Sequence, residues 1–390
     1  MSPSRNLTVL TLSVIILSLG QNMWFGFAPE FLRALGAGAL VIGAFSSLQT
    51  FFEALYQFPG GWMTDRFGLR RALVTANVAA AVGYFIYLIS PNFSIVFLGL
   101  PFVMVWPAFV VPATTGLLAE TAAPQASRRA FNFAAQEVIT RLPLLIAPVA
   151  GGLLITLLSD VQAGVRVGLG ITLAAAMLTL FLQGAGYQSN TKLSEAKSIF
   201  GIWQEMDGGL KRLLASEILV RYAEVLPRAL LVLYAIQILN APYWGFGLLL
   251  AVEAGVAILV RGPLAKLVDA AGYKQLLLMS FLATALFPIT IVFAPSWLWL
   301  FAGYVISGLK AAGNPIRSAL ISDLVNPARS GQHVGLYESL VNLAVLPAGF
   351  IGGLLWIARP VLPFWLALAT GLIGCVLFAR LGPGDKPNLQ

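Results

Sequence analysis

The sequence predicts an all-α polytopic membrane protein with 12 transmembrane helices in two pseudo-symmetric six-helix bundles. Of its 390 residues, 58% are hydrophobic and only 10% are charged, whereas soluble globular chains carry about 25% charged residues. The mean hydropathy is +0.85. Water does not tolerate a surface so poor in charge, so we expect lipid to surround most of the chain.

Apolar runs of spanning length, separated by Gly, Pro and charge clusters, divide the chain into twelve segments. Each run is long enough to cross once, because a bilayer-spanning helix needs about 20 residues. We expect the spans at about 7–33, 38–60, 71–90, 94–119, 131–157, 163–187, 213–238, 242–265, 275–293, 297–322, 331–357 and 361–379. The predicted domains are an N-terminal bundle over 1–187, a cytoplasmic linker over 188–212 and a C-terminal bundle over 213–390.

The placement of lysine and arginine predicts the orientation in the membrane. With the N-terminus inside, the cytoplasmic segments hold fifteen of these residues and the external segments and span ends hold three. Cytoplasmic loops are enriched in these residues, so we expect a multi-pass protein of the cytoplasmic or inner membrane with both termini in the cytoplasm. The formal net charge of +8 therefore reflects topology, and we expect no nucleic-acid partner.

Several classes of function find no support in the sequence. The phosphate-binding loop Gly-x-x-x-x-Gly-Lys-Ser/Thr, Gly-x-Ser-x-Gly and His-Glu-x-x-His are all absent, and each is typical of an enzyme or ATPase. The single cysteine, Cys375, excludes an internal disulfide, and the single histidine, His333, has no companion at metal-ligand spacing. We therefore expect no enzyme, no cofactor and no metal site.

An internal repeat relates the two halves of the chain, which is how many transporters are built. The segment Asp65–Arg70 returns in degenerate form as Asp269–Lys274. Further matches follow in the same order, at offsets between 201 and 204 residues. The matched pairs are Pro59 and Pro263, Gly68 and Gly272, Pro112 and Pro315, Glu120 and Asp323, Glu137 and Glu338, and Gly151 and Gly352.

Charged residues inside predicted spans need a reason, because a charge at the centre of a span costs about 2.5–3.5 kcal/mol on insertion scales. Predicted spans three, six, nine and twelve hold none of these charges, so we expect every third helix to face lipid while the others line an interior. The residues are Glu53, Glu137, Arg141, Glu217, Arg221, Glu224, Arg228, Glu253, Arg261, Lys310, Arg317 and Glu338.

These polar residues form stripes on single helical faces. The fullest stripe runs from Glu217 to Arg228 with spacings of 4, 3 and 4, which places four charges on one face. Shorter stripes are Gln49, Glu53 and Gln57 in the second span, Glu137 and Arg141 in the fifth, and Lys310, Asn314 and Arg317 in the tenth. Two interpretations stay open: ion pairs that merely neutralise one another, or a carboxyl group that alternates between buried and cation-paired surroundings and so carries a proton.

A loop motif then points to a family. Gly61–Arg71 reads Gly-Trp-Met-Thr-Asp-Arg-Phe-Gly-Leu-Arg-Arg between the second and third predicted spans. It resembles the Gly-x-x-x-Asp-Arg-x-Gly-x-Arg-Arg motif of the major facilitator superfamily. The resemblance implies a secondary transporter that works by alternating access, with a central cavity lined mainly by spans one, four, seven and ten.

The resemblance also implies a cytoplasmic latch that stabilises the outward-open state. Its residues here would be Gly61, Asp65, Arg66, Gly68, Arg70 and Arg71. The second copy keeps Asp269 and Gly272 but lacks the following arginine, so we expect a weaker latch there. In the fifth span, Ala147–Gly152 resembles the tail of the family's antiporter signature, although glycine and proline here also permit close helix packing.

Together these observations predict a monomeric secondary active transporter for proton-coupled efflux of a small amphiphilic or anionic organic solute. The proton-coupling candidates are Glu53, Glu224 and Glu253. The substrate-binding candidates are Gln21, Asn22, Trp24, Trp106, Arg228, Lys310, Asn314 and Arg317. The charge-pair candidates are Glu137, Arg141, Glu217, Arg221 and Glu338. The alternatives are a proton- or sodium-coupled symporter importing an organic anion or sugar, and a receptor or enzyme on a carrier scaffold.

Overall fold

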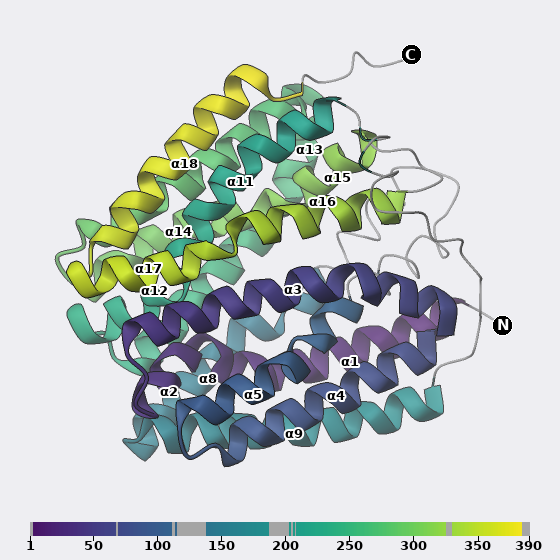
Figure 1. Ribbon diagram of the computed structural model, residues 1–390, viewed down its shortest axis with the longest axis vertical. Helices are drawn as coiled ribbons and strands as arrows, with labels where there is room; N and C mark the ends of the chain where they lie inside the picture. Colours follow the sequence, from purple (N-terminus) through teal and green to yellow (C-terminus); the bar gives the residue numbers. More distant parts are fainter. Residues whose placement is uncertain are drawn as a thin grey trace. The chain divides into compact units, whose positions relative to one another are not determined.

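The computed structural model describes residues 3–67, 69–110, 114, 138–186, 203, 206, 208–324 and 330–383, and every regular element among them is a helix (Figure 1). This confirms the predicted all-α class. Ten candidate spans in the described residues are long and apolar enough to cross a membrane. The predicted seventh and tenth spans are helical but are not among these ten. They carry the fullest charged stripe, from Glu217 to Arg228, and the stripe of Lys310, Asn314 and Arg317.

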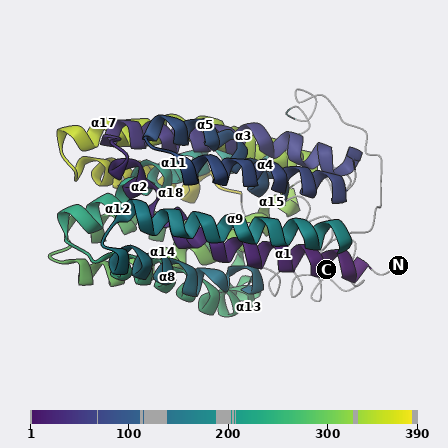
Figure 2. The same cartoon turned by 90° about the horizontal axis from the view of Figure 1, so that it is seen from below.

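The first half of the chain contains eight described elements. They are α1 (Pro3–Trp24), η1 (Phe25–Phe27), α2 (Ala28–Ala34), α3 (Ala39–Phe67), α4 (Leu69–Ile89), α5 (Phe93–Val103), α8 (Pro143–Leu158) and α9 (Val161–Gly186). Helix α9 packs against both α1 and α4, and Figure 2 shows α1 directly beside it. Leu17 of α1 and Leu169 of α9 are fully buried in this half.

The second half contains ten described elements. They are α11 (Gly208–Arg228), α12 (Leu230–Leu233), the π-helical turn η2 (Tyr234–Ile238), α13 (Tyr243–Val292), η3 (Trp297–Trp299), α14 (Leu300–Ala312), α15 (Asn314–Leu324), α16 (Ser330–Val345), α17 (Pro347–Ala358) and α18 (Leu362–Leu381). Helix α13 contains the eighth and ninth predicted spans, and Gly272 breaks it with φ 77° and ψ 162°. Only glycine adopts such a conformation without strain.

The chain forms two compact units. The N-terminal unit contains Met1–Ala37, Phe51–Ala196 and Pro242–Leu248, and the C-terminal unit contains Gly38–Thr50, Lys197–Ala241 and Leu249–Gln390. Helices α3 and α13 are therefore each divided between the units near their first turns. The predicted linker 188–212 lies mostly outside the described residues, so the predicted domain boundaries stay a prediction.

The first turns of α13 pack on α8 within the N-terminal unit through glycine. A methyl group added at Gly152 would overlap the carbonyl oxygen of Tyr243, and one added at Gly247 would overlap that of Pro148. The two helices thus approach backbone to backbone. Glycine at both positions is required by this contact and not by chain flexibility.

The first turns of α3 pack on α17 in the same way within the C-terminal unit. A methyl group at Gly353 would lie 2.8 Å from the carbonyl oxygen of Ala39, and one at Gly43 would overlap that of Gly349. Gly43 and Gly247 are 204 residues apart, as are Ala39 and Tyr243, whereas Gly152 and Gly353 are 201 residues apart, as are Pro148 and Gly349. The internal repeat therefore extends to the packing of individual backbone atoms.

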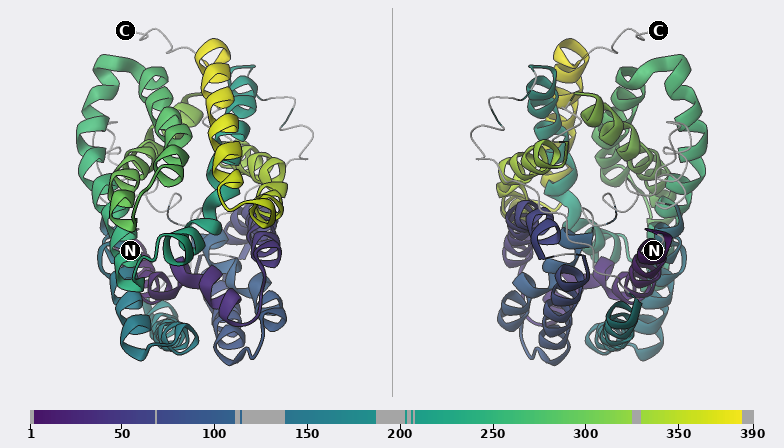
Figure 3. Two further views of the ribbon diagram at one scale, coloured as in Figure 1. Left: turned by 90° about the vertical axis from the view of Figure 1, so that its left-hand side faces the viewer. Right: turned by 90° about the vertical axis from the view of Figure 1, so that its right-hand side faces the viewer.

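Helix α11 is the centre of the C-terminal unit. It packs on α16, α17 and α18, and Figure 3 shows α18 alongside it. Leu213 of α11, Phe281 of α13 and Phe378 of α18 belong to one buried cluster. Large apolar side chains on the outer faces of both units are exposed, including Leu157 and Leu259, as expected where lipid replaces water.

Candidate functional site

The charged stripe on α11 meets α15 and α16 at Glu217. This carboxylate is only 1% exposed. Arg317 of α15 donates to one of its oxygens and the Tyr337 hydroxyl of α16 donates to the other. The second amino group of Arg317 lies 2.9 Å from Glu338. We call these four residues the Glu217 cluster.

Two turns further along α11, Glu224 is held by three basic side chains. Its Oε1 lies 3.4 Å from Lys310 Nζ on α14 and 3.5 Å from Arg228 Nη2, and its Oε2 lies 3.2 Å from Arg221 Nη1. We call Glu224, Lys310, Arg228 and Arg221 the Glu224 cluster. Arg221 also joins the two clusters, because its Nε lies 3.5 Å from Oε1 of Glu217.

The two clusters together carry an excess of positive charge. Four basic side chains surround three carboxylates, so the balance is +1 when all are ionised. The Arg228 side chain is 49% exposed, whereas Arg317 and Lys310 are mostly buried. Because burying charge is costly unless it is paired, the accessible end of the network at Arg228 is the natural place for an additional anion.

Glu253 has different surroundings. It lies on α13, is partly buried, and accepts a hydrogen bond of 2.7 Å from the Ser307 hydroxyl of α14. Its backbone also lies close to α14, since a methyl group at Gly308 would approach the Glu253 carbonyl oxygen to 2.8 Å. In the described part of the chain, Glu253 forms no ion pair. Its carboxyl group is therefore not neutralised by a cation, unlike that of Glu224.

Lys310 of the Glu224 cluster has two further neighbours, and Asn314 lies apart from it. Lys310 Nζ lies 5.9 Å from the centre of the Phe287 ring, a cation–π distance. Ser280 fixes the backbone of α14 here by donating to the Lys310 carbonyl oxygen at 3.0 Å. Asn314 is the first residue of α15 and is exposed, outside both clusters.

The predicted polar residues of α1 lie in a packed aromatic region of the N-terminal unit. Gln21 donates to the Tyr84 hydroxyl, and Asn22 donates to the Ser18 carbonyl oxygen of its own helix at 2.7 Å. Trp24 is 2% exposed, and its indole nitrogen donates to Thr172 at 3.0 Å.

Trp24 also packs edge-on against two tyrosines, with ring centres 6.2 Å from Tyr84 and 5.8 Å from Tyr87. Trp106 is buried as well, at 4% exposure. Both tryptophans have almost no free surface in this structure, so a substrate contact by either one stays a prediction.

The remaining ionisable candidates are placed as follows. Glu53 lies in α3, and Arg141 lies two residues before the start of α8; both are partly buried. Glu137 falls outside the described residues, so the predicted Glu137–Arg141 pair is not tested. The predicted Glu217–Arg221 pair is present at 3.5 Å, but Arg317 is the closer partner of Glu217.

The loop motif is only partly described. Gly61, Asp65 and Arg66 lie in the last turns of α3, and Gly68 falls outside the described residues. Arg71 is exposed, and Arg70 donates to the carbonyl oxygen of Gly184 near the end of α9. The last carbonyl groups of a helix lack partners within the helix, so Arg70 caps α9. Asp269 lies in α13 three residues before the break at Gly272.

Two side chains of the candidate site were not predicted from the sequence, Ser307 and Tyr337. Ser307 lies three residues before Lys310, so extending the polar stripe of the tenth span by one turn would have identified it. Tyr337 is one aromatic residue in a largely apolar run, and the sequence carries no signal that its hydroxyl reaches Glu217. In the described ranges, no three His, Cys, Asp or Glu side chains gather as metal ligands would.

Comparison with known proteins gives a family match over most of the chain. The family model described as Major Facilitator Superfamily matches residues 10–241 and 213–390. Tetracycline resistance protein, class C, from Escherichia coli is 26% identical over 145 residues, which is 36% of this chain and 37% of that protein. Quinolone resistance protein NorA from Staphylococcus aureus (strain MRSA252) is 22% identical over 149 residues, 38% of each chain. The chain thus spans little more than a third of the length of these curated relatives.

Solved structures match over nearly the whole chain. The nucleoside transporter NupG has a TM-score of 0.77 at 12% identity, covering 96% of this chain and 99% of that one. The human organic anion transporter MFSD10 has a TM-score of 0.72 at 16% identity, covering 97% and 99%. At such low identity the likeness shows the fold alone.

Proposed function

The chain belongs to the major facilitator superfamily and is a multi-pass membrane transporter, not an enzyme, and we propose that it exports a small amphiphilic organic anion in exchange for protons. It acts as a monomer in the cell membrane, with both termini in the cytoplasm. The observation that carries this proposal is the net positive charge of the Glu217 and Glu224 clusters. The most exposed basic side chain of these clusters is Arg228, which is 49% exposed.

The two oxygens of Glu224 have separate partners, and this allows an anion to bind. Arg228 and Lys310 share Oε1, whereas Arg221 approaches Oε2. An arriving carboxylate, sulfonate or phosphate group takes Arg228 and Lys310, while Arg221 continues to neutralise Glu224. The Phe287 ring beside Lys310 offers an apolar surface to the rest of an amphiphilic solute.

Glu253 is the better proton carrier of the two central candidates. A carboxylate without a cation is costly in a membrane interior, and proton uptake removes that cost. The Ser307 hydroxyl can donate to the ionised carboxylate or accept from the protonated acid, so both states keep a hydrogen bond. Glu224 keeps its charge through three cations and belongs to solute binding. Glu53 remains a third candidate.

Export is supported by the relatives and by one sequence feature. The curated relatives are named as tetracycline and quinolone resistance proteins, and a transporter that confers resistance removes the drug from the cell. Ala147–Gly152, which resembles the antiporter signature, lies in α8 with Ala147 and Gly152 buried.

Transport by purified protein in proteoliposomes tests the proposal. A thermal-shift screen against aromatic carboxylates and sulfonates first selects a solute, since a ligand stabilises the state it binds. In vesicles whose exposed face corresponds to the cytoplasm, an acidic lumen should then drive accumulation of that solute. Glu253→Gln should abolish this pH-driven accumulation but retain solute counterflow. Full retention by this variant would remove Glu253 from the coupling mechanism.

Solute affinity gives a second, separate measurement. A charge-assisted hydrogen bond contributes about 1.5–3 kcal/mol, so Arg228→Gln should weaken binding of the selected anion by roughly tenfold or more. Arg359→Gln is the matched control, because this arginine is also exposed but lies between α17 and α18, outside the clusters. Equal affinity in wild type and Arg228→Gln would contradict the assigned anion contact.

Cotransport of an organic anion with protons is the second candidate. It is favoured by the presence of the protonatable Glu253 and the cationic Glu224 cluster in one unit, because a proton at Glu253 would offset the charge of an arriving anion. The direction of the driving gradient separates the candidates. Accumulation with an alkaline lumen would establish symport, whereas accumulation with an acidic lumen supports exchange.

A further inference from the structure

A basic patch lies where α11 begins and α18 ends. The two helices pack antiparallel: a methyl group at Gly371 would lie 3.2 Å from Ala223, whereas one at Gly374 would lie 2.8 Å from Val220. Moving along α18 toward its C-terminal end therefore means moving toward the start of α11. This register places Arg380 level with Lys211 and Arg212. We call these three residues the basic patch.

Among the residues that the structure describes, none of the three side chains of the basic patch takes part in an ion pair. Lys211 instead lies over Trp203, with Nζ 5.0 Å from the ring centre, and Trp203 is 37% exposed. Tryptophan beside basic residues is typical of the boundary between membrane and water.

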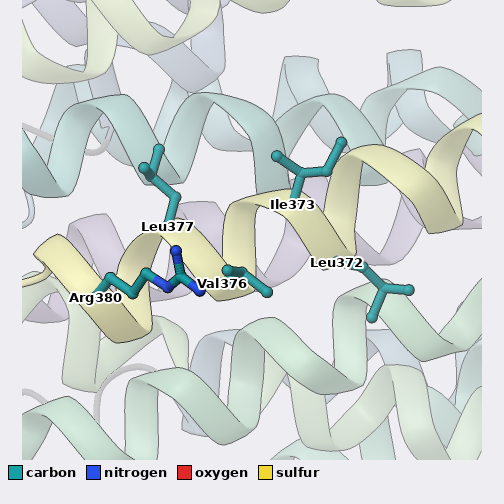
Figure 4. A pocket seen from close by; sticks show the side chains of 5 residues that line it. All are labelled: Leu372, Ile373, Val376, Leu377 and Arg380. Atoms are coloured by element: carbon teal, nitrogen blue, oxygen red, sulfur yellow. The ribbon is translucent and has the colours of Figure 1, made fainter.

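An apolar groove leads away from the basic patch along α18 (Figure 4). Its lining residues lie on one stripe of the helix and differ from those that pack on α11. They are Leu372, Ile373, Val376, Leu377 and Arg380. The stripe covers eight residue steps, about 12 Å of helix, which is a large part of the length of an acyl chain in one leaflet.

We propose that the basic patch and this groove bind an anionic phospholipid. The phosphate group lies against Arg380, Lys211 and Arg212, and one acyl chain follows Leu377, Val376 and Ile373 along α18. A guanidinium group can donate two parallel hydrogen bonds to two oxygens of one phosphate group. Anionic lipids are enriched in the cytoplasmic leaflet, and the predicted orientation places this end of the C-terminal unit on the cytoplasmic side. The site shares no residue with the Glu217 or Glu224 cluster.

Native mass spectrometry of the delipidated full-length protein tests this site with two probes, dioleoylphosphatidylglycerol and dioleoylphosphatidylcholine. Phosphatidylglycerol should bind more tightly. Each basic residue near an anionic surface contributes about a fivefold gain in affinity, so Arg380→Gln should bind phosphatidylglycerol about fivefold more weakly. The triple variant, which combines Arg380→Gln with Lys211→Gln and Arg212→Gln, should bind phosphatidylglycerol on the order of a hundredfold more weakly. Phosphatidylcholine binding should not change in any variant.

Two controls distinguish the lipid site from simpler explanations. Arg359→Gln removes an exposed arginine near the other end of α18 and should bind phosphatidylglycerol like the wild type, whereas Arg380→Lys should retain most of its affinity. Unchanged phosphatidylcholine binding by the triple variant verifies that it is folded. Equal affinity of the wild type for both lipids would overturn the proposal. So would displacement of phosphatidylglycerol by an equal concentration of inorganic phosphate.

Discussion

Replacing the buried Glu217 with glutamine should destabilise the C-terminal unit more than any exposed change in the two clusters. Its carboxylate is 1% exposed and accepts from Arg317 and Tyr337. Arg221 adds a third contact at 3.5 Å. A glutamine side chain has the same shape as glutamate but no charge. Its amide nitrogen is a donor, so it would face the donor group of Arg317 or Tyr337 without forming a hydrogen bond.

The magnitude follows from the partners that remain. Breaking a buried ion pair by removing one partner costs about 3–5 kcal/mol. Arg317 still has Glu338 at 2.9 Å, so we expect the lower end of this range, about 3 kcal/mol. The matched comparison is Arg228→Gln, whose side chain is 49% exposed. Exposed ion pairs contribute about 0–1 kcal/mol, so this change should scarcely alter stability.

Thermal and denaturant unfolding of the detergent-purified variants measures both values. The double variant Glu217→Gln with Arg317→Gln restores the charge balance of the clusters, so it should be less destabilised than the sum of its two single variants. The reasoning is refuted if Glu217→Gln unfolds within 1 kcal/mol of the wild type. It is also refuted if the double variant is simply additive.

Three further changes test individual contacts. Gly353→Val should force the first turns of α3 away from α17 and lower both the melting temperature and transport, whereas Gly170→Val, where the space is open, should alter neither. Trp24→Phe removes one buried hydrogen bond and should lower the free energy of unfolding by about 1 kcal/mol. Because Trp24 is 2% exposed, solute affinity should stay unchanged. A tenfold loss of affinity would identify Trp24 as a binding residue. Ser307→Ala should reduce pH-driven transport severalfold while counterflow persists, and a normal pH-driven rate would show that Glu253 does not depend on this hydroxyl.

The fold was largely predictable because membrane helices are specified by length and composition. Runs of about 20 apolar residues predicted most spans. The internal repeat predicted which helix of the first half corresponds to which helix of the second half. The exceptions are informative. Helix α11 and the pair α14–α15 carry so many charges that they are not among the ten described helices that length and composition identify as candidate spans, although the apolar runs at 213–238 and 297–322 predicted a span at both places.

The candidate site was predictable only within single helices. Periodicity placed Glu217, Arg221 and Glu224 on one face of α11. The structure confirms this, because Arg221 forms ion pairs with both glutamates. The partners from other helices could not be derived. Whether Glu224 meets Lys310 or Arg317 depends on the depth and rotation of α14 and α15 relative to α11, and these are set by packing across many residues.

The surroundings of Trp24 and Gln21 in α1 could not be predicted from the sequence either. Trp24 was placed on a cavity-type helix, but a hydropathy pattern does not specify which side of α1 faces α9. The structure turns Trp24 toward Thr172. Its neighbour Gln21 meets Tyr84 instead of an open surface. Polarity in a span therefore identifies a residue that needs a partner, and the partner can be the protein itself.

The packing of α1 and α11 explains how a charged stripe can be present on α11 and absent from its counterpart α1. Three positions that face α9 and α18 correspond at an offset of 203 residues, and each pair is small or buried in both halves. These pairs are Ser13 and Ser216, Leu17 and Val220, and Gly20 and Ala223.

At the same offset, the charged stripe of α11 corresponds to neutral residues of α1 and of the first position of η1. The corresponding pairs are Val14 and Glu217, Ser18 and Arg221, Gln21 and Glu224, and Phe25 and Arg228. Gln21 satisfies its amide with one hydroxyl, whereas Glu224 in the equivalent position requires three cations. Because the face that packs on α9 or α18 is kept and the adjacent face is free to change, one half could acquire a network of charged side chains while keeping these contacts.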